Sequence, residues 1–196
     1  SMFFLKERIM KHVIAYEGKV GVALGLLQEA YVPHMVPWIN RLVDIEGTLQ
    51  RPPYSPLSGI DWIRKLPAEK GKHEVFAVLE RVGEKGRYRY VGNMGIHGVE
   101  WPSGVASTGS MIGLKAAQGR GLGTEAKLLL LYHAFMIMGL RKLTSSVKAF
   151  NVQSAGHLLK CGYQPVGRYR AHHLHRGAFV DTLLFEAFRE NWQPVW

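Results

Sequence analysis

The chain has 196 residues, of which 47% are hydrophobic and 20% are charged, a balance typical of a soluble globular protein with one substantial core. We therefore expect a single domain over residues 1–196. The formal net charge of +10 favours acidic or phosphate-bearing partners, but the basic residues are dispersed, which argues against a dedicated nucleic-acid-binding module. The single cysteine, Cys161, excludes an internal disulfide and a cysteine-rich zinc site, and it fits a reducing, cytoplasmic location.

The first segments predict a strand followed by short helices. Residues 18–27 mix glycine with apolar residues and predict a strand. Residues 28–41 carry apolar residues at helical spacing, but their two prolines are expected to break or kink the helix. Ser58 is expected to cap a short helix over 60–66.

Three strands and a long helix are predicted next. Residues 73–82 and 87–101 flank a Gly-Glu-Lys-Gly turn and alternate well enough to form a hairpin. Residues 105–114 follow a Pro-Ser-Gly turn and predict a further strand, although glycines weaken it. A helix is expected over 121–138, with Gly139 as its stop.

The last third predicts a strand over 141–150, a helix over 151–162 with Asn151 as its N-cap, and a closing hairpin. The hairpin strands are expected at 163–175 and 178–188. This order of elements predicts an α+β or mixed α/β domain.

The apolar stretch from Leu128 to Leu140 predicts a buried helix rather than a membrane anchor. It is interrupted by His133, and it is shorter than the ~20 residues that a spanning helix needs. Charged residues from Lys6 onward interrupt the start of the chain too early for a secretory signal. We therefore expect no contact with a membrane.

Three interpretations compete for the glycine-rich turn before this helix. A phosphate loop requires lysine after its last glycine, but Gly123 is followed by Thr124. A dinucleotide fingerprint starting at Gly119 would need glycine at its sixth position, which is again Thr124. What remains is a helix N-terminus whose backbone N–H groups and positive dipole end face an anion, with a plain tight turn as the alternative.

Two segments together carry a resemblance to a known family. The stretch QGRGLG at 118–123 matches the Gln/Arg-x-x-Gly-x-Gly/Ala signature of the GNAT superfamily of N-acetyltransferases, and it lies between the fourth predicted strand and a long helix, as in that family. About thirty residues later, FNVQSAGHLLKCGY resembles the family's Asn-x-x-Ser…Leu-x-x-x-Gly-Phe segment, in the form typical of the ribosomal-protein N-terminal acetyltransferase (Rim-type) branch. The resemblance extends from about residue 24 to 192 and is strongest from 105 onward.

The resemblance implies a mostly antiparallel, V-splayed sheet of about seven strands flanked by helices, and acetyl-coenzyme A as co-substrate without a metal. The end of the fourth strand would pair with the pantetheine arm, the glycine turn would hold the pyrophosphate with added charge from Arg120, and the second segment would contact the arm near the sulfur. The residues so implied are Ile112, Gly113, Leu114, Gln118, Gly119, Arg120, Gly121, Leu122, Gly123, Thr124, Asn151 and Ser154.

Acyl transfer to an amine needs a neutral nucleophile, a polarised thioester carbonyl and a proton for the departing thiolate. The family polarises the carbonyl with a backbone N–H, here near Ile112, and often protonates the thiolate with a tyrosine, whose position is Leu158 in this chain. Ser154 is our first candidate for the proton donor; the alternative is a serine that bonds its own helix. Glu100 and His97, near the end of the third strand, are the candidate bases.

Secondary donor candidates are Cys161 and Tyr163, of which Tyr163 is expected in the core. The sequence HHLH at 172–175 invites a metal site, but a strand would place only two of its histidines on one face, so we expect none. Aromatic residues are expected to wall the acceptor cleft or to pack in the core: Trp38, Tyr54 and Trp62.

The sequence thus indicates an acetyl-coenzyme A-dependent N-acetyltransferase that acts on a primary amine, either a protein N-terminus or a small molecule. The net positive charge disfavours a cationic polyamine as acceptor. A non-catalytic acyl-coenzyme A-binding module of the same fold is the alternative, because the family's tyrosine is missing. A homodimer is compatible with the sequence.

Overall fold

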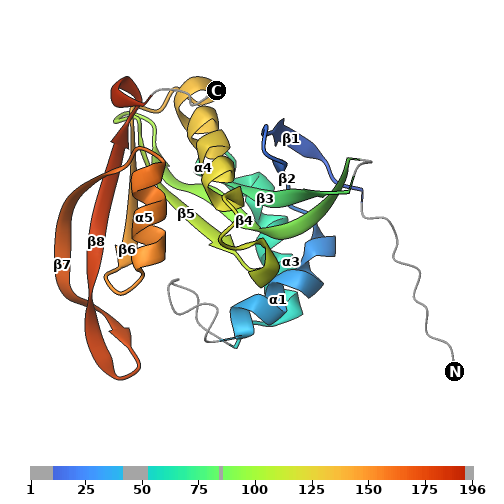
Figure 1. The fold of residues 1–196 in the computed structure, drawn as a ribbon, viewed down its shortest axis with the longest axis horizontal. Coiled ribbons are helices and arrows are strands. Elements are labelled where there is room, and N and C mark those ends of the chain that lie inside the picture. Colours follow the sequence, from blue (N-terminus) through green and yellow to red (C-terminus); the bar gives the residue numbers. More distant parts are fainter. Residues whose placement is uncertain (1–10, 42–52, 84–85, 193–196) are drawn as a thin grey trace, which may run out of the picture.

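The computed structural model describes residues 11–41, 53–83 and 86–192 (Figure 1). The strands are β1 Ile14–Glu17, β2 Val22–Leu26, β3 His73–Val82, β4 Arg87–Glu100, β5 Val105–Ile112, β6 Lys142–Lys148, β7 Gln164–His175 and β8 Ala178–Phe188. The α-helices are α1 Val32–Asn40, α3 Pro56–Lys65, α4 Leu122–Tyr132 and α5 Val152–Lys160. Short 3₁₀ turns occupy Glu29–Tyr31, Leu66–Glu69, Lys115–Ala117 and Arg189–Asn191.

The strands form one sheet in the order β1-β2-β3-β4-β5-β6-β8-β7, and every neighbouring pair is antiparallel except β5 and β6. The predicted mixed α/β class with a mostly antiparallel sheet is confirmed. The strand expected over 18–27 is present as β2 but begins only at Val22, because residues 18–21 form a turn ending at Gly21, with φ of 106°, and an additional strand, β1, precedes this turn. The sheet of the described residues therefore has 8 strands instead of about seven.

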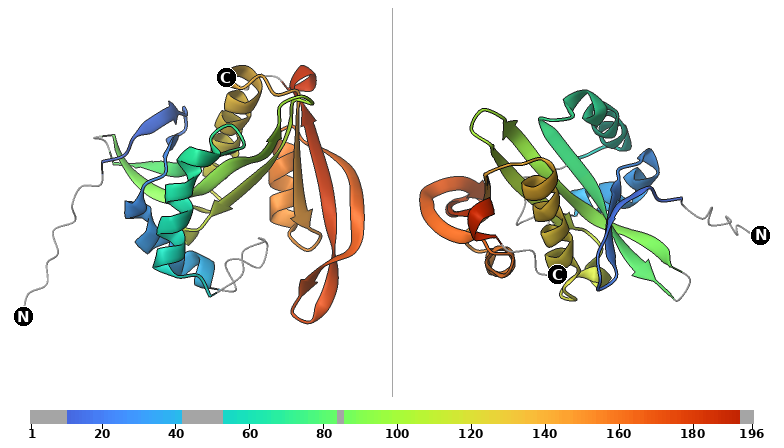
Figure 2. Two further views of the ribbon diagram at one scale, coloured as in Figure 1. Left: turned by 180° about the vertical axis from the view of Figure 1, so that it is seen from behind. Right: turned by 90° about the horizontal axis from the view of Figure 1, so that it is seen from above.

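The sheet is splayed at its only parallel pairing among the described strands. β5 and β6 pair from Val105 to Ser107, while β5 stays paired with β4 as far as Ile112 and β6 stays paired with β8 as far as Lys148. Beyond Ser107 the two halves of the sheet diverge into a V (Figures 1 and 2). The predicted V-shaped opening is thus present, and it lies next to the end of β5.

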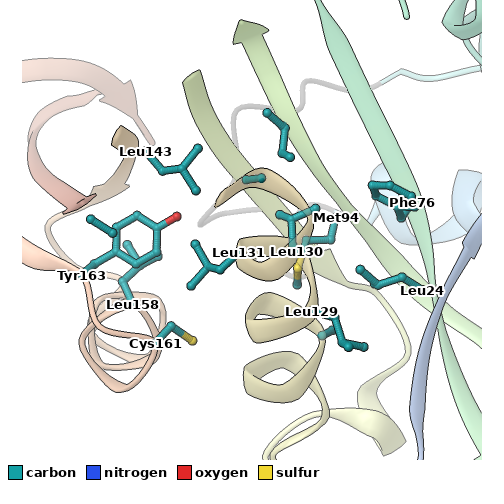
Figure 3. Packing of buried hydrophobic residues seen from close by; sticks show 14 of the residues in the cluster. Leu24, Phe76, Met94, Leu129, Leu130, Leu131, Leu143, Leu158, Cys161 and Tyr163 are labelled. Carbon is teal, nitrogen blue, oxygen red and sulfur yellow. The ribbon is translucent and has the colours of Figure 1, made fainter. Parts of the chain in front are cut away.

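Helices cover both faces of the sheet. α4 and α5 lie on one face, and α1 and α3 lie on the other (Figure 2). Leu129 and Leu130 of α4 pack with Leu24, Phe76 and Met94 of the sheet in the main core (Figure 3). The apolar run is thus a buried helix as predicted as far as Phe135, whereas Met136 and Ile137 near its end are exposed. Within the described residues no helix is both long enough and apolar enough to cross a membrane.

Helix boundaries differ from the expectation in three places. The two prolines do not end α1. Pro33 lies in the first turn, where proline loses no intrahelical N–H bond. Pro37 lies inside the helix, which continues past it to Asn40. The predicted cap of the second helix was wrong: Ser55 Oγ accepts the N–H of Ser58 at 3.0 Å, and Pro56 starts the helix. The α-helical part of the long helix ends at Tyr132 and continues as a π-helical turn before Gly139.

Candidate active site

The glycine turn leads directly into the N-terminus of α4. Gly119 and Gly121 have φ of 72° and 81°, which glycine adopts without strain. A Cβ at either position would meet nothing within 4 Å, so open space adjoins the turn. Thr124 donates its N–H to Gly121 O at 3.0 Å. Because this bond begins the helix, the N–H groups of Leu122 and Gly123 lie ahead of it and are suited to face an anion.

The turn adjoins both β5 and α5. A Cβ on Gly123 would lie 3.6 Å from Ile112 Cγ1 and 3.9 Å from His157 Nε2. The acidic residue of the first turn, Glu125, is engaged elsewhere, since its carboxylate accepts the N–H groups of Val20 at 2.6 Å and Val22 at 3.3 Å. Its charge therefore serves to tie α4 to the β1–β2 turn.

Arg120 is held by an ion pair with Glu80 of β3, whose buried carboxylate also accepts a hydrogen bond from Arg89 at 2.6 Å. Burial by itself would raise the pKa of Glu80, but the hydrogen bonds and charges of the two arginines outweigh it and hold that pKa below its ordinary value. Two arginines share one carboxylate, so this cluster retains one net positive charge beside the glycine turn. Arg120 therefore anchors the turn to the sheet while adding to its positive potential.

A cavity of about 1200 Å³ occupies the opening of the V. Both halves of the sheet line it, together with parts of α3 and α5. The candidates that it brings together are His97, Asn151 and Ser154, with Leu158 at the position of the family's tyrosine. Glu100 does not line it, because that side chain is exposed at the end of β4 near the turn to β5.

The edge of β5 that faces the opening has no strand partner beyond Ser107 among the described residues. Gly113 and Leu114, expected to bond the cofactor arm, donate their N–H groups to Val91 O at 2.9 and 3.2 Å. Gln118 Nε2 donates to Ile112 O at 2.7 Å. The amides of Gly113 and Leu114 are thus engaged by β4, and the backbone available to an extended ligand lies between Ser107 and Ile112.

Asn151 begins α5 as predicted. Its Oδ1 accepts the N–H of Ser154 at 3.0 Å, which fixes the first turn of the helix. Both residues line the cavity, so helix capping and ligand binding are compatible at this position.

His97 lies over a floor made by two glycines. Cβ atoms placed on Gly95 and Gly109 would come within 2.9 Å and 3.6 Å of its Nε2, so only glycine leaves room for the ring at Gly95. Gly109 belongs to the part of β5 that has left β6. Burial, followed by the positive charge of His73 and Lys127, lowers the pKa of His97. The imidazole is therefore neutral at pH 7 and able to accept a proton.

Two buried polar features were not identified from the sequence. Lys127 of α4 is 1% exposed, and burial lowers its pKa to about 8. Thr108 of β5 lines the cavity, and its Oγ1 lies 2.7 Å from the hydroxyl of Tyr163. Tyr163 is buried as predicted, and so is Cys161. The sequence did contain a signal for the burial of Lys127, because this residue lies four residues before Leu131 and therefore on the same side of an apolar helix.

Of the expected aromatic wall, Tyr54 and Trp62 line the cavity. Trp38 instead packs over Gly113 and stacks with Tyr90 at a ring distance of 5.3 Å. The three histidines of the HHLH segment lie in β7, and among the described residues no group of three or more His, Cys, Asp or Glu side chains is arranged to hold a metal ion.

Comparison with known proteins identifies the class to which this fold and site belong, the acetyltransferases. A family model described as "Acetyltransferase (GNAT) domain" matches residues 27–164. Because this match covers more than half of the chain, the chain belongs to the GNAT acetyltransferase family.

Solved structures show the same fold. Spermidine N-acetyltransferase from Vibrio cholerae, in complex with CoA and spermine, matches with a TM-score of 0.79 at 15% identity over 88% of this chain and 98% of its own. A putative acetyltransferase from T. thermophilus matches with a TM-score of 0.70 at 26% identity over 90% of each chain. A putative ribosomal-protein-serine acetyltransferase from Vibrio cholerae matches with a TM-score of 0.66 at 22% identity over 92% of this chain and 98% of its own.

Proposed function

We propose that residues 1–196 form a single N-acetyltransferase domain that uses acetyl-coenzyme A and transfers the acetyl group directly to a primary amine. The observation that carries this proposal is the placement of a neutral imidazole, His97, beside the free edge of β5, whose far end adjoins the glycine turn. An anion-binding turn and a proton acceptor thus flank the same opening of the sheet.

The residues present fit coenzyme A. The left-handed conformations of Gly119 and Gly121 leave open space at the turn, and the N–H groups of Leu122 and Gly123 would bind the pyrophosphate. The edge of β5 would bind the pantetheine arm, and Asn151 would bond it from the other side. When bound, the co-substrate supplies an activated acyl group as a thioester.

The chain's own residues then provide the proton transfers. His97, neutral at pH 7, would take a proton from the ammonium group of the acceptor, which leaves a neutral amine to attack the acyl carbon. A backbone N–H near Ile112 would stabilise the negative charge that develops on the carbonyl oxygen. Ser154 would give a proton to the departing sulfur, in place of the tyrosine that Leu158 replaces. The new bond joins nitrogen and the acyl carbon, and the bond from that carbon to sulfur breaks.

We propose a protein N-terminus as acceptor, as in the Rim-type branch. The support is the sequence resemblance together with the charge of the cavity. The cavity is lined by three lysines, Lys65, Lys142 and Lys148, and by two carboxylates, Asp61 and Glu186. This excess of positive charge would repel a spermidine-like polycation.

The test measures thiol release from acetyl-coenzyme A against N-terminal peptides, spermidine and simple amines, with coenzyme A binding measured separately by calorimetry. Turnover with peptides above that with spermidine supports the proposal. Binding without turnover on any amine contradicts the enzymatic role, and absence of coenzyme A binding contradicts the site itself.

A further inference from the structure

A β-bulge in β4 places Tyr90 and Asn93 on the same face of the sheet. The pairing of β3 with β4 shifts between Tyr90 and Gly92, so Val91 is an extra residue in β4. In a regular strand, side chains three residues apart point to opposite faces. Because of the extra residue, Tyr90 lies beside Asn93, and its hydroxyl donates to Asn93 Oδ1 at 2.6 Å.

The orientation of the Asn93 carboxamide is fixed from both ends. The buried ring of Tyr90 stacks with Tyr31 at a centroid distance of 4.3 Å and with Trp38 at 5.3 Å. Burial raises the pKa of Tyr90, so its hydroxyl keeps the proton that it donates. At the other end of the carboxamide, Asn93 Nδ2 donates to Met35 Sδ at 3.3 Å. The oxygen therefore faces Tyr90 and the nitrogen faces the sulfur.

Asn93 also forms part of the cavity wall and retains bonding capacity there. It lines the cavity, although its residue is only 9% exposed. A carboxamide oxygen accepts two hydrogen bonds and the nitrogen donates two, and a thioether sulfur is a weak acceptor. Within the part of the chain that the structure describes, Tyr90 uses one site on the oxygen and Met35 uses one N–H. One acceptor site on Oδ1 thus remains for a ligand in the cavity.

Asn93 and His97 lie on the same face of β4, with Gly95 between them. The His97 ring extends over Gly95, because a Cβ on that glycine would lie 2.9 Å from His97 Nε2. Positions two residues apart on a strand are separated by about 7 Å. A nitrogen that donates to two acceptors at the usual bond length holds them about 5 Å apart. The space over Gly95 therefore has the dimensions of one amino group held between the carboxamide and the imidazole.

This space adjoins the proposed site of acyl transfer on the face opposite to the cofactor. Asn93 pairs with Met111, the neighbour of Ile112. The glycine turn and Asn151 begin α4 and α5, which lie on one face of the sheet, whereas Asn93 contacts Met35 of α1 on the other face (Figure 2). An acceptor that enters from the side of α1 and α3 would reach Asn93 next to the thioester.

We propose that Asn93, oriented by Tyr90, binds the acceptor amine and holds it beside His97. This inference rests on the proposed function, because it takes His97 as the base. Asn93 Oδ1 accepts one N–H of the ammonium group, and a second N–H points at the imidazole. After that proton has moved to His97, the bond to Asn93 keeps the neutral amine in place to attack the acyl carbon. Asn93 contacts the substrate, and Tyr90 is a positioning residue that acts through it.

The experiment measures kcat and KM for the N-terminal peptides of the turnover assay, and the affinity for acetyl-coenzyme A by calorimetry. Asn93→Ala should raise the KM for the peptides by about 10- to 100-fold, the range expected for a lost hydrogen bond to a charged group. The affinity for acetyl-coenzyme A should not change. Tyr90→Phe keeps the stacked ring but releases the carboxamide, so it should raise this KM by a smaller factor. Tyr88→Phe is its matched control, because it removes a tyrosine hydroxyl from the same strand outside the cavity lining, and it should leave KM unchanged.

Asn93→Asp separates contact with the amine from support of the fold. A carboxylate still accepts from Tyr90 and binds an ammonium group, so the KM for the peptides should equal or fall below that of the wild type. Its negative charge should also raise the pKa of His97, on which His73 of β3 and Lys127 of α4 act in the wild type. The fall in rate at acid pH should therefore move to higher pH, an effect that a purely structural role would not produce.

An unchanged KM in Asn93→Ala with acetyl-coenzyme A still bound would overturn the inference and leave the acetyltransferase proposal standing. An Asn93→Asp protein whose fall in rate at acid pH does not move would overturn it as well. If Asn93→Ala does not bind acetyl-coenzyme A, the KM and the pH profile of Asn93→Asp decide. A wild-type protein that binds no coenzyme A, or that acetylates no amine, would instead overturn the proposed function.

Discussion

Lys127→Met is expected to stabilise the protein at neutral pH. Lys127 is fully buried, and burial is the main cause that lowers its pKa from 10.5 to about 8. At about 1.36 kcal/mol per pKa unit, holding the charged form inside the protein costs about 3 kcal/mol. Methionine fills similar space without a charge and favours helix, so the substitution should recover most of this free energy.

The gain should depend on pH. The folded pKa of Lys127 lies below the unfolded value, so between pH 8 and about 10.5 the unfolded chain binds a proton that the native protein has released. The stability of the wild type therefore rises with pH across this window, whereas the variant lacks this contribution. The difference between the two proteins should be about 3 kcal/mol at pH 7 and should shrink towards zero as pH approaches 10.5.

Urea unfolding of both proteins at pH 7 and pH 10 measures this difference. Lys160→Met is the matched control, because Lys160 is an exposed lysine on α5, and its replacement should change stability little at either pH. A Lys127→Met protein that is less stable than the wild type at pH 7, or equally more stable at both pH values, would refute the reasoning.

Three further substitutions test the site. Gly121→Val should abolish coenzyme A binding, because it forces a β-branched residue into a left-handed conformation in the turn. Gly139→Val is its control: Gly139 also has a positive φ but lies beyond the far end of the helix, so coenzyme A binding should stay intact. Ser154→Ala should lower kcat by about 10²-fold with KM little changed, and an unchanged kcat would remove the serine from the mechanism. His97→Gln should lower kcat by about 10²–10⁴-fold. It should also remove the acid limb of the rate profile, which is the fall in rate that the wild type shows as pH drops through the lowered pKa of His97. An acid limb that persists in the variant would assign the base to another residue.

Much of the fold followed from local patterns. The alternation in 73–82 and 87–101 and the position of Asn151 predicted β3, β4 and the start of α5 correctly, because each signal lies within a few residues of its element. The boundary errors arose where two local preferences compete. Ser55 and Ser58 are both suitable caps, and the proline after Ser55 decides in favour of the earlier start.

The site was less accessible to sequence reasoning, because its geometry depends on contacts distant in the chain. Nothing near Arg120 indicates that Glu80 binds it from forty residues away. Likewise, the room for the His97 ring comes from Gly109 on the neighbouring strand as well as from Gly95, and glycine within a strand predicts only a weakened strand. Pairings of this kind follow from strand register, which single-residue patterns do not specify.

The buried charge of Lys127 connects stability with the proposed chemistry. Besides raising the free energy of the native state, this charge helps to lower the pKa of His97, after burial and the charge of His73. Lys127→Met should therefore raise the pKa of His97 and move the acid limb of the rate profile upward while it stabilises the fold. Stability and function would then oppose one another at one side chain, as is common near active sites. A stabilised variant whose acid limb does not move would show that Lys127 does not act on His97. The benefit of retaining a buried lysine would then have to lie in its effect on His157, whose pKa it also lowers.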